Sequence, residues 1–232
     1  MKTKLSTWLG TEFVEIIGEG KPGAPPDSAA HELFRRCEAE LKPYHLSLDN
    51  IARLRVWGRD KDARASATAA RSKILTGQRR AASSSFISQE WFDSDATVGV
   101  ELLAMRPLDP DTQRHPIDFE PPRNYLCYLN YGGWLFFSGF TSEAQTLKKQ
   151  TEEVLATIDG ALARARTDWG NVVKLSALLQ RGHDLDSVRR VLASAGRPSV
   201  PEVEFSFVDG FAGGKYLLEV EATARRSAQR LG

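Results

Sequence analysis

The chain has 232 residues, of which 41% are hydrophobic and 26% charged, and 31 basic against 30 acidic side chains give a net charge of +1. This composition is close to the globular average and argues against disordered, collagen-like and coiled-coil proteins. A balanced charge supplies no basic surface for nucleic acid, and no apolar run approaches the roughly 18 residues of a membrane span. We therefore expect one large or two small globular domains that bind neither nucleic acid nor membrane.

The two cysteines, Cys37 and Cys127, are too few for a disulfide framework. The opening MKTKLSTWLG carries two lysines but no apolar core, so we expect no secretion signal. Both features favour a cytoplasmic protein.

In the first half of the chain, short apolar runs alternate with segments of helical periodicity. We expect Ser28 to cap the first of these helices and Pro43 to end it. The predicted order is a strand, a helix, a strand-helix segment and two further strands, over Glu12–Gly20, Ser28–Leu41, Asn50–Leu75, Ser83–Phe92 and Ala96–Met105.

A proline-rich segment follows, with five of the eleven prolines of the chain between Pro107 and Pro122. It shows neither helical periodicity nor strand alternation, which is typical of an extended connector. The predicted organisation is a domain over 1–106, a linker over 107–123 and a second domain over 124–232.

The second half shows the same order of strands and helices more clearly. Apolar residues from Leu147 to Ala165 fall on one helical face, and Asp184 or Asp186 opens a later helix that Gly196 ends. We predict strand, helix, strand, helix, strand and strand over Tyr131–Phe140, Gln145–Arg166, Asn171–Leu179, Leu185–Gly196, Glu202–Val208 and Lys215–Ala224. This order predicts an α+β fold, in which two helices pack on one face of a sheet.

The two halves also align with one another. Residues 50–75 align with residues 171–196 without a gap, and this alignment pairs Asn50 with Asn171 and Leu54 with Leu175. The pattern predicts a duplication of about half the chain.

The second half resembles the Rid (reactive intermediate deaminase, YjgF-like) superfamily, and the first half looks like a divergent copy. The resemblance rests on GGWLFFSGF, EAQTLKKQTEEVLATIDGALARA, NVVKLSALLQ and LEVEATA in this order. It implies two tandem chorismate-mutase-like domains and a homo-oligomer, in the first place a trimer, with clefts between neighbouring domains. It also implies hydrolysis of small imines or enamines to ketones and ammonia, with neither a metal nor an organic cofactor.

The same resemblance assigns site residues. Tyr125 would line the cleft, the Ser138-Gly139 backbone and Glu219 would orient the attacking water, and Glu221 would lie on the same strand face. The arginine that binds the substrate carboxylate in the family has Val200, or Ser199 with a shift of one residue, at its position here. Arg80, beside Arg79, is the best local substitute.

In the first half, Ser83 or Ser84 stands at the arginine position, Gly99 opposite Glu219 and Glu101 opposite Glu221. Each of these assignments has a structural alternative: the glutamates could form a solvated strand face, Tyr125 could pack in the core, and Arg79 and Arg80 could be solvated turn residues.

The GEGKPG segment is typical of a turn, since proline stands where a phosphate-binding loop needs serine or threonine. The four histidines are scattered and suggest no metal site.

These residues favour a cofactor-independent enzyme that hydrolyses or tautomerises an imine, enamine or related carbonyl-derived metabolite in a specialised pathway. A chorismatase-like hydrolase of an enol ether is one alternative. A non-catalytic ligand-binding or scaffold protein is another, and an endoribonuclease ranks third because the balanced charge gives RNA binding no support.

Overall fold

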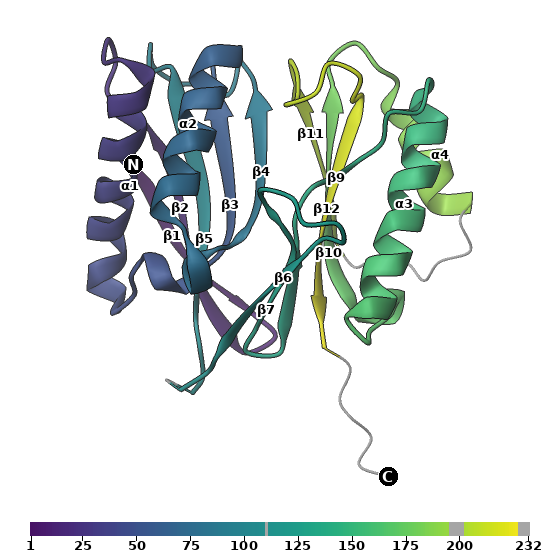
Figure 1. The fold of residues 1–232 in the computed structure, drawn as a ribbon, viewed down its shortest axis with the longest axis horizontal. Helices are drawn as coiled ribbons and strands as arrows, with labels where there is room; N and C mark the ends of the chain where they lie inside the picture. Colours follow the sequence, from purple (N-terminus) through teal and green to yellow (C-terminus); the bar gives the residue numbers. More distant parts are fainter. Residues whose placement is uncertain (110, 195–201, 227–232) are drawn as a thin grey trace. The chain divides into compact units, whose positions relative to one another are not determined.

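A computed structural model describes residues 1–109, 111–194 and 202–226, and the chain divides into two compact units, residues 1–132 and 133–232. Within each unit, two helices lie along one face of a β-sheet (Figure 1). The predicted α+β class and its tandem repetition are therefore confirmed.

The first unit contains a five-stranded sheet of order β1-β2-β5-β3-β4, in which β3 and β4 are parallel and the other neighbours antiparallel. The strands β6 and β7 form an antiparallel pair that is not part of this five-stranded sheet. The strands are β1 (Lys2–Trp8), β2 (Thr11–Glu19), β3 (Ile51–Gly58), β4 (Ala82–Ile87), β5 (Val98–Arg106), β6 (Arg114–Asp118) and β7 (Leu126–Tyr131). The helices are α1 (Pro26–Leu41) and α2 (Lys61–Ile74), with short 3₁₀ turns η1 (Lys42–Tyr44), η2 (Leu48–Asn50) and η3 (Gly77–Arg79).

The core of the first unit lies between this sheet and its two helices. Alternate strand residues such as Leu54 and Val56 face the apolar side of α1, where Leu33 and Phe34 are buried. Strand alternation therefore sends one set of side chains to the core and the other to the opposite face of the sheet.

The second unit contains strands in the order β11-β10-β12-β8, with the short β9 paired to β12. The elements are β8 (Trp134–Phe137), β9 (Phe140–Thr141), α3 (Leu147–Arg164), η4 (Trp169–Asn171), β10 (Val172–Gln180), α4 (Leu185–Ser194), β11 (Glu202–Val208) and β12 (Leu218–Arg225). Asp184 accepts a hydrogen bond from the Asp186 amide at the start of α4, as the capping prediction requires.

The two units repeat one topology. The order β4-β3-β5-β2 in the first corresponds to β11-β10-β12-β8 in the second, with the parallel pair at the same place. A 3₁₀ turn precedes both β3 and β10, and both strands shift register two residues after that turn, at Ile51/Arg53 and Val172/Lys174. The gapless alignment of residues 50–75 with 171–196 thus corresponds to matching local structure.

Three strands, β1, β6 and β7, were not predicted, and one predicted strand is divided in two. The β1 sequence KTKLSTW has little apolar content and stays largely exposed, and β6 falls within the proline-rich segment, where Pro116 is tolerated in a short strand. β7 precedes the predicted strand Tyr131–Phe140, which is itself divided into β8 and β9. The predicted end of the last helix at Gly196 lies outside the described residues.

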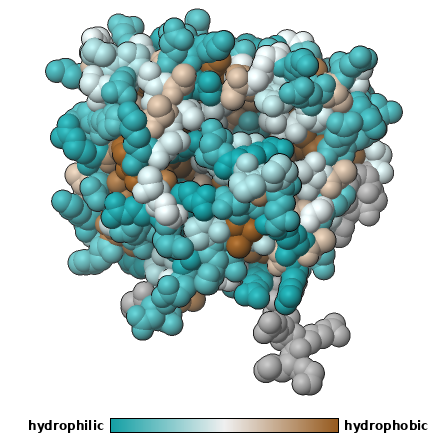
Figure 2. Space-filling model, viewed as in Figure 1, coloured by the Kyte–Doolittle hydropathy of each residue, from teal (hydrophilic) through white to brown (hydrophobic). Residues whose placement is uncertain are grey.

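No helix among residues 1–109, 111–194 and 202–226 is long and apolar enough to cross a membrane. The face of the molecule drawn in Figure 2 is mainly hydrophilic, with small separate apolar patches.

Gly58→Ala is expected to destabilise the first unit, because a Cβ there would lie 2.1 Å from the backbone nitrogen of Arg64. Backbone at the start of α2 would have to move, at a cost of about 1–3 kcal/mol. The matched control is Gly160→Ala within α3, where a Cβ meets nothing within 4 Å and helix propensity predicts a gain of about 0.5–1 kcal/mol. Urea unfolding of both variants measures the difference, and equal stabilities would contradict the packing described.

Cys37 is fully buried in α1, and this burial raises the pKa of its thiol to about 12. Because the thiolate is the nucleophile, we expect iodoacetamide to leave Cys37 unmodified at pH 8 in the folded protein and to alkylate it in urea. Peptide mass spectrometry reads out the site. Rapid alkylation without denaturant would show that this part of α1 opens.

Candidate functional site

The structure places the predicted site residues in two groups. Arg80 and Tyr125 belong to the first unit, whereas the second unit holds the group that we call the Glu219 group, made of Ser138, Gly139, Glu219 and Glu221. Each group is described within its own unit.

The Glu219 group is built on β12 and on the turn between β8 and β9. Glu219 lies opposite Leu178 of β10 and Glu221 opposite Ser176, so the two carboxylates share one face of the sheet, as strand alternation predicts. Both side chains are buried, with 8% of Glu219 and 1% of Glu221 exposed.

Gly139 lies directly against the Glu219 carboxylate. A Cβ at Gly139 would lie 1.7 Å from Oε1 and 2.3 Å from Cδ of Glu219, so a larger residue here would displace the Glu219 carboxylate. Ser138 beside it is fully buried. The predicted association of Glu219 with the Ser138-Gly139 turn therefore exists, and it holds a carboxylate against backbone, where a proton acceptor can be positioned.

A polar network lies beside this group on the same sheet face. Ser176 donates to Glu204 Oε2 at 3.0 Å, and Lys174 Nζ lies 2.8 Å from Glu202 and 3.6 Å from Glu204. Glu202 and Glu204 of β11 are thus paired at the edge of the sheet, which distinguishes them from the buried glutamates of β12.

The first unit uses the equivalent face differently. Gly99, opposite Glu219 in the repeat, is covered by the Trp91 indole, and a Cβ at Gly99 would lie 2.0 Å from that ring. Trp91 Nε1 donates to Glu101 at 2.8 Å, and Arg55 Nη1 pairs with the same carboxylate at 2.9 Å. The Trp91 indole and the Arg55–Glu101 ion pair therefore occupy the positions that correspond to the Glu219 group of the second unit.

A small cavity in the first unit brings together Arg80 and Tyr125 with residues that sequence reasoning did not select. It has a volume of about 180 Å³, and we call it the Arg71 pocket; the residues that line it include Arg71, Leu75, Arg80, Ser83, Tyr125 and Leu126. Arg71 of α2 is 7% exposed, and its Nη1 donates to Ser83 Oγ of β4 at 3.0 Å. The pocket therefore combines a buried guanidinium with a phenol ring.

Arg71 is buried because of the way α2 packs on β4. The helix presents alanines to the sheet, including Ala63, Ala67 and Ala70, and these short side chains leave room for arginines on the same side. Arg64, two turns earlier, likewise donates to Ser85 Oγ at 3.1 Å. The spacing of seven between two arginines among buried alanines was the available signal, but arginine on a helix is normally a solvated residue.

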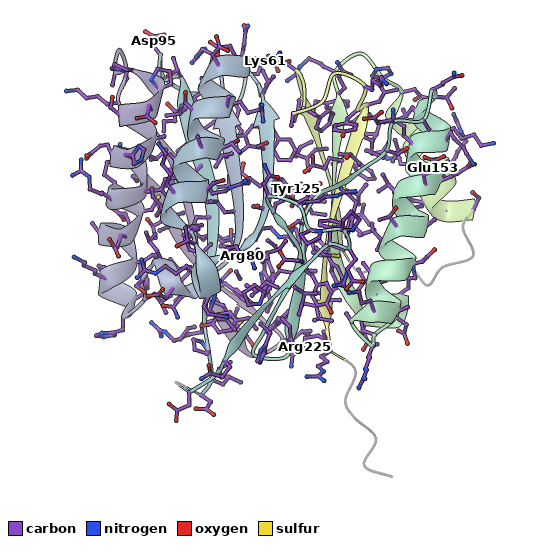
Figure 3. The ribbon with its side chains drawn as sticks, in the orientation of Figure 1. Lys61, Arg80, Asp95, Tyr125, Glu153 and Arg225 are labelled. Carbon is purple, nitrogen blue, oxygen red and sulfur yellow. The ribbon has the colours of Figure 1, made fainter. Side chains whose placement is uncertain are left out.

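Tyr125 lies in the segment before β7 and is part of an aromatic cluster. Its hydroxyl accepts a hydrogen bond from Arg123 Nη1 at 2.9 Å, and its ring meets Phe119 edge to face at 5.3 Å. Figure 3 labels Tyr125 together with Arg80, which comes from the end of η3. These contacts fix the phenol ring at the pocket wall.

Arg80 is held by an ion pair at this pocket. Its Nη1 and Nη2 contact Asp118 Oδ1 and Oδ2 at 2.6 and 3.1 Å, and its Nε donates to the Gly77 carbonyl at 3.3 Å. The predicted role of Arg80 as the substitute for the family arginine thus falls on a side chain already bound to a carboxylate. The positions Ser199 and Val200 lie outside the described residues.

Arg114 of β6 fixes the backbone that carries Arg80. It donates from Nε to the Gln78 carbonyl at 3.0 Å and from Nη2 to the carbonyls of Arg79 and Arg80 at 3.4 and 3.0 Å. Its guanidinium also lies over the Tyr131 ring at 5.0 Å. Burial is the main cause that lowers the pKa of Arg114 from its ordinary value.

A larger cavity of about 920 Å³ lies beside β2 and α1, near Lys21, Arg36 and Trp91. Several of its charges are already paired, since Lys2 binds Asp93 at 2.8 Å and Glu19 accepts from the backbone of residues 93 and 94. It contains none of the predicted site residues. Within the described ranges, no group of three or more histidine, cysteine, aspartate or glutamate side chains could hold a metal ion.

The fold is that of a tandem α+β protein, in which two similar units each place two helices on one face of a sheet. Residues 118–226 match the family described as "Endoribonuclease L-PSP", which confirms the resemblance of the second half of the chain to the YjgF/Rid family. No curated protein matches the chain.

Solved structures match either the whole chain or one half of it. A chorismatase is 19% identical, covers 95% of this chain and 79% of its own length, and has a TM-score of 0.63, so the two proteins share a fold. A YjgF/YER057c/UK114 family member from Mycobacterium tuberculosis is 23% identical over 49% of this chain and 99% of its own, with a TM-score of 0.44. A YjgF family protein from Neisseria meningitidis is 24% identical over 50% and 97%, also with a TM-score of 0.44.

Arg114→Gln is expected to loosen η3 and to cost about 1.5–3 kcal/mol of stability, because three carbonyl contacts of a charged donor are lost. Hydrogen exchange of residues 76–82 should accelerate. Arg123→Gln is the control, since that exposed side chain contacts Tyr125 and Phe119 but no carbonyl of η3. Unchanged exchange in Arg114→Gln would contradict its role in fixing the turn.

Proposed function

We propose that the chain is a cofactor-independent enzyme that acts on a small imine, enamine or related carbonyl-derived compound carrying a carboxylate. The observation that carries the proposal is the Arg71 pocket. A guanidinium presents a planar fork of N–H donors that matches a carboxylate, and burial strengthens such bonds. The volume of about 180 Å³ favours a small molecule rather than a polymer chain.

The Glu219 group supports the catalytic part of the proposal. In hydrolysis of an imine, water adds to the carbon of the C=N bond while a carboxylate accepts its proton. That proton then passes to the nitrogen and gives a carbinolamine. Transfer of the proton of its hydroxyl group to the same nitrogen accompanies breakage of the C–N bond, so that ammonia leaves and the ketone forms. A buried glutamate held against Gly139 has the chemical character that both steps need.

Hydrolysis of an enol ether is the second candidate reaction. The similarity to a chorismatase, which extends over 95% of this chain, favours it. There the carboxyl group would protonate the enol carbon before water adds. Ammonia release distinguishes the first reaction, because the second releases an alcohol and a carbonyl compound.

Glu219→Gln is expected to lower turnover by about 10²- to 10⁴-fold, the usual contribution of a general acid or base. The assay follows ketone formation from freshly generated 2-iminobutyrate and 2-iminopropionate against the rate in buffer. Glu202→Gln is the matched control, since this glutamate lies on the same sheet face but is exposed and paired with Lys174. Equal rates for both variants would exclude Glu219 from catalysis and would favour the ligand-binding alternative.

Arg71→Gln is expected to weaken binding of 2-oxobutyrate by about 10- to 100-fold, as expected for a charge-assisted hydrogen bond of about 1.5–3 kcal/mol. Arg71→Lys should recover part of the affinity, because it keeps the charge without the fork. Calorimetric titration measures both, and Arg79→Gln serves as control because Arg79 is exposed and binds Asp49. Unchanged affinity in Arg71→Gln would remove the pocket from the proposal.

A further inference from the structure

The wall of the Arg71 pocket contains two arginines, Arg71 and Arg80, and each has a hydrogen-bond partner within the first unit. Arg71 donates to the hydroxyl of Ser83, a neutral group, at 3.0 Å. Arg80 instead meets the carboxylate of Asp118 with both terminal nitrogens, at 2.6 and 3.1 Å. Both arginines line the same cavity of about 180 Å³.

Asp118 binds Nη1 and Nη2 of Arg80, the two N–H donors that a ligand carboxylate would also need. A guanidinium binds a carboxylate best through two parallel N–H groups, and Asp118 occupies such a pair. The Arg80 Nε is directed to the Gly77 carbonyl at 3.3 Å. Asp118 therefore cancels the charge of Arg80 and also occupies its bidentate edge.

The ion pair is placed where it can respond to a ligand. About a third of each partner is exposed, 34% of the Arg80 side chain and 38% of the Asp118 side chain. The Arg80 backbone is held independently, since Arg114 donates to its carbonyl at 3.0 Å. Loss of Asp118 would thus release the Arg80 guanidinium while its main chain remains fixed.

We infer that Asp118 determines the charge of the ligand that the Arg71 pocket prefers. By neutralising Arg80, it makes the pocket select a compound with one carboxylate over a compound with two. Asp118 does not line the cavity and acts through Arg80, so it is a specificity-determining residue and not a catalytic one. This inference rests on the proposed function, because it requires that the pocket binds anions.

The test compares a monoanion and a dianion, 2-oxobutyrate and 2-oxoglutarate, by calorimetric titration at low ionic strength. The wild type should bind 2-oxobutyrate more tightly. Asp118→Asn should shift the affinity ratio toward 2-oxoglutarate by about fivefold or more, since a freed cation near a partly exposed site contributes on this scale. Asp49→Asn is the matched control, because Asp49 pairs with Arg79, which does not line the cavity.

A second variant separates charge selection from a change in folding. In Asp118→Asn combined with Arg80→Gln, the ratio should return to within about twofold of the wild-type value, because the released cation is gone. An unchanged ratio in Asp118→Asn, or a shift that persists in the double variant, would overturn the inference.

The same titrations distinguish this failure from that of the proposed function. If the wild type binds 2-oxobutyrate and Arg71→Gln does not, the pocket binds anions whatever Asp118 does. If the wild type binds neither anion, the proposed binding role fails, and the inference about Asp118 fails with it.

Discussion

Burial of the Arg71 guanidinium between α2 and β4 is the constraint on which the candidate pocket depends. A buried cation requires hydrogen-bond acceptors, and β4 supplies serine hydroxyls on the face that carries Ser83 and Ser85. The helix must approach closely for these bonds to form, which the alanines of α2 permit. The alanines and arginines of ARASATAAR in α2 therefore pack together with the serines of ASSSF in β4. The Arg71 pocket is lined by Arg71 and Ser83, one from each of these segments.

The two units share one topology but differ in the side chains on the sheet face opposite the helices. In the second, the sheet face opposite the helices holds Glu219 against Gly139, where a larger side chain would displace the carboxylate. In the first, the equivalent strand position is Gly99, and the Trp91 indole fills the space above it. The duplication thus preserves strand order, while the Trp91 indole in the first unit fills the space that corresponds to the Glu219 carboxylate.

Sequence patterns predicted what depends on local periodicity. The main order of strands and helices, the shared face of Glu219 and Glu221, and the gapless alignment around Asn50 and Asn171 all follow from strand alternation and helical spacing. The strand β1 was missed because KTKLSTW is polar and largely exposed, so no apolar pattern marks it. Arg71 was missed because its burial depends on β4, and its spacing of seven from Arg64 is a weak signal when arginine on a helix is normally solvated. Arg80 was predicted to substitute for the family arginine and lines the Arg71 pocket, but its pairing with Asp118, 38 residues away, is a tertiary contact that sequence cannot show.

The central claim is that the Arg71 guanidinium binds the carboxylate of a small ligand. A crystal structure of the wild-type protein with 2-oxobutyrate tests it most directly. We predict ligand density in the Arg71 pocket, with carboxylate oxygens within about 3 Å of the Arg71 nitrogens and the ligand beside the Tyr125 ring. Density for the ligand elsewhere, with the Arg71 pocket unchanged, would contradict the claim.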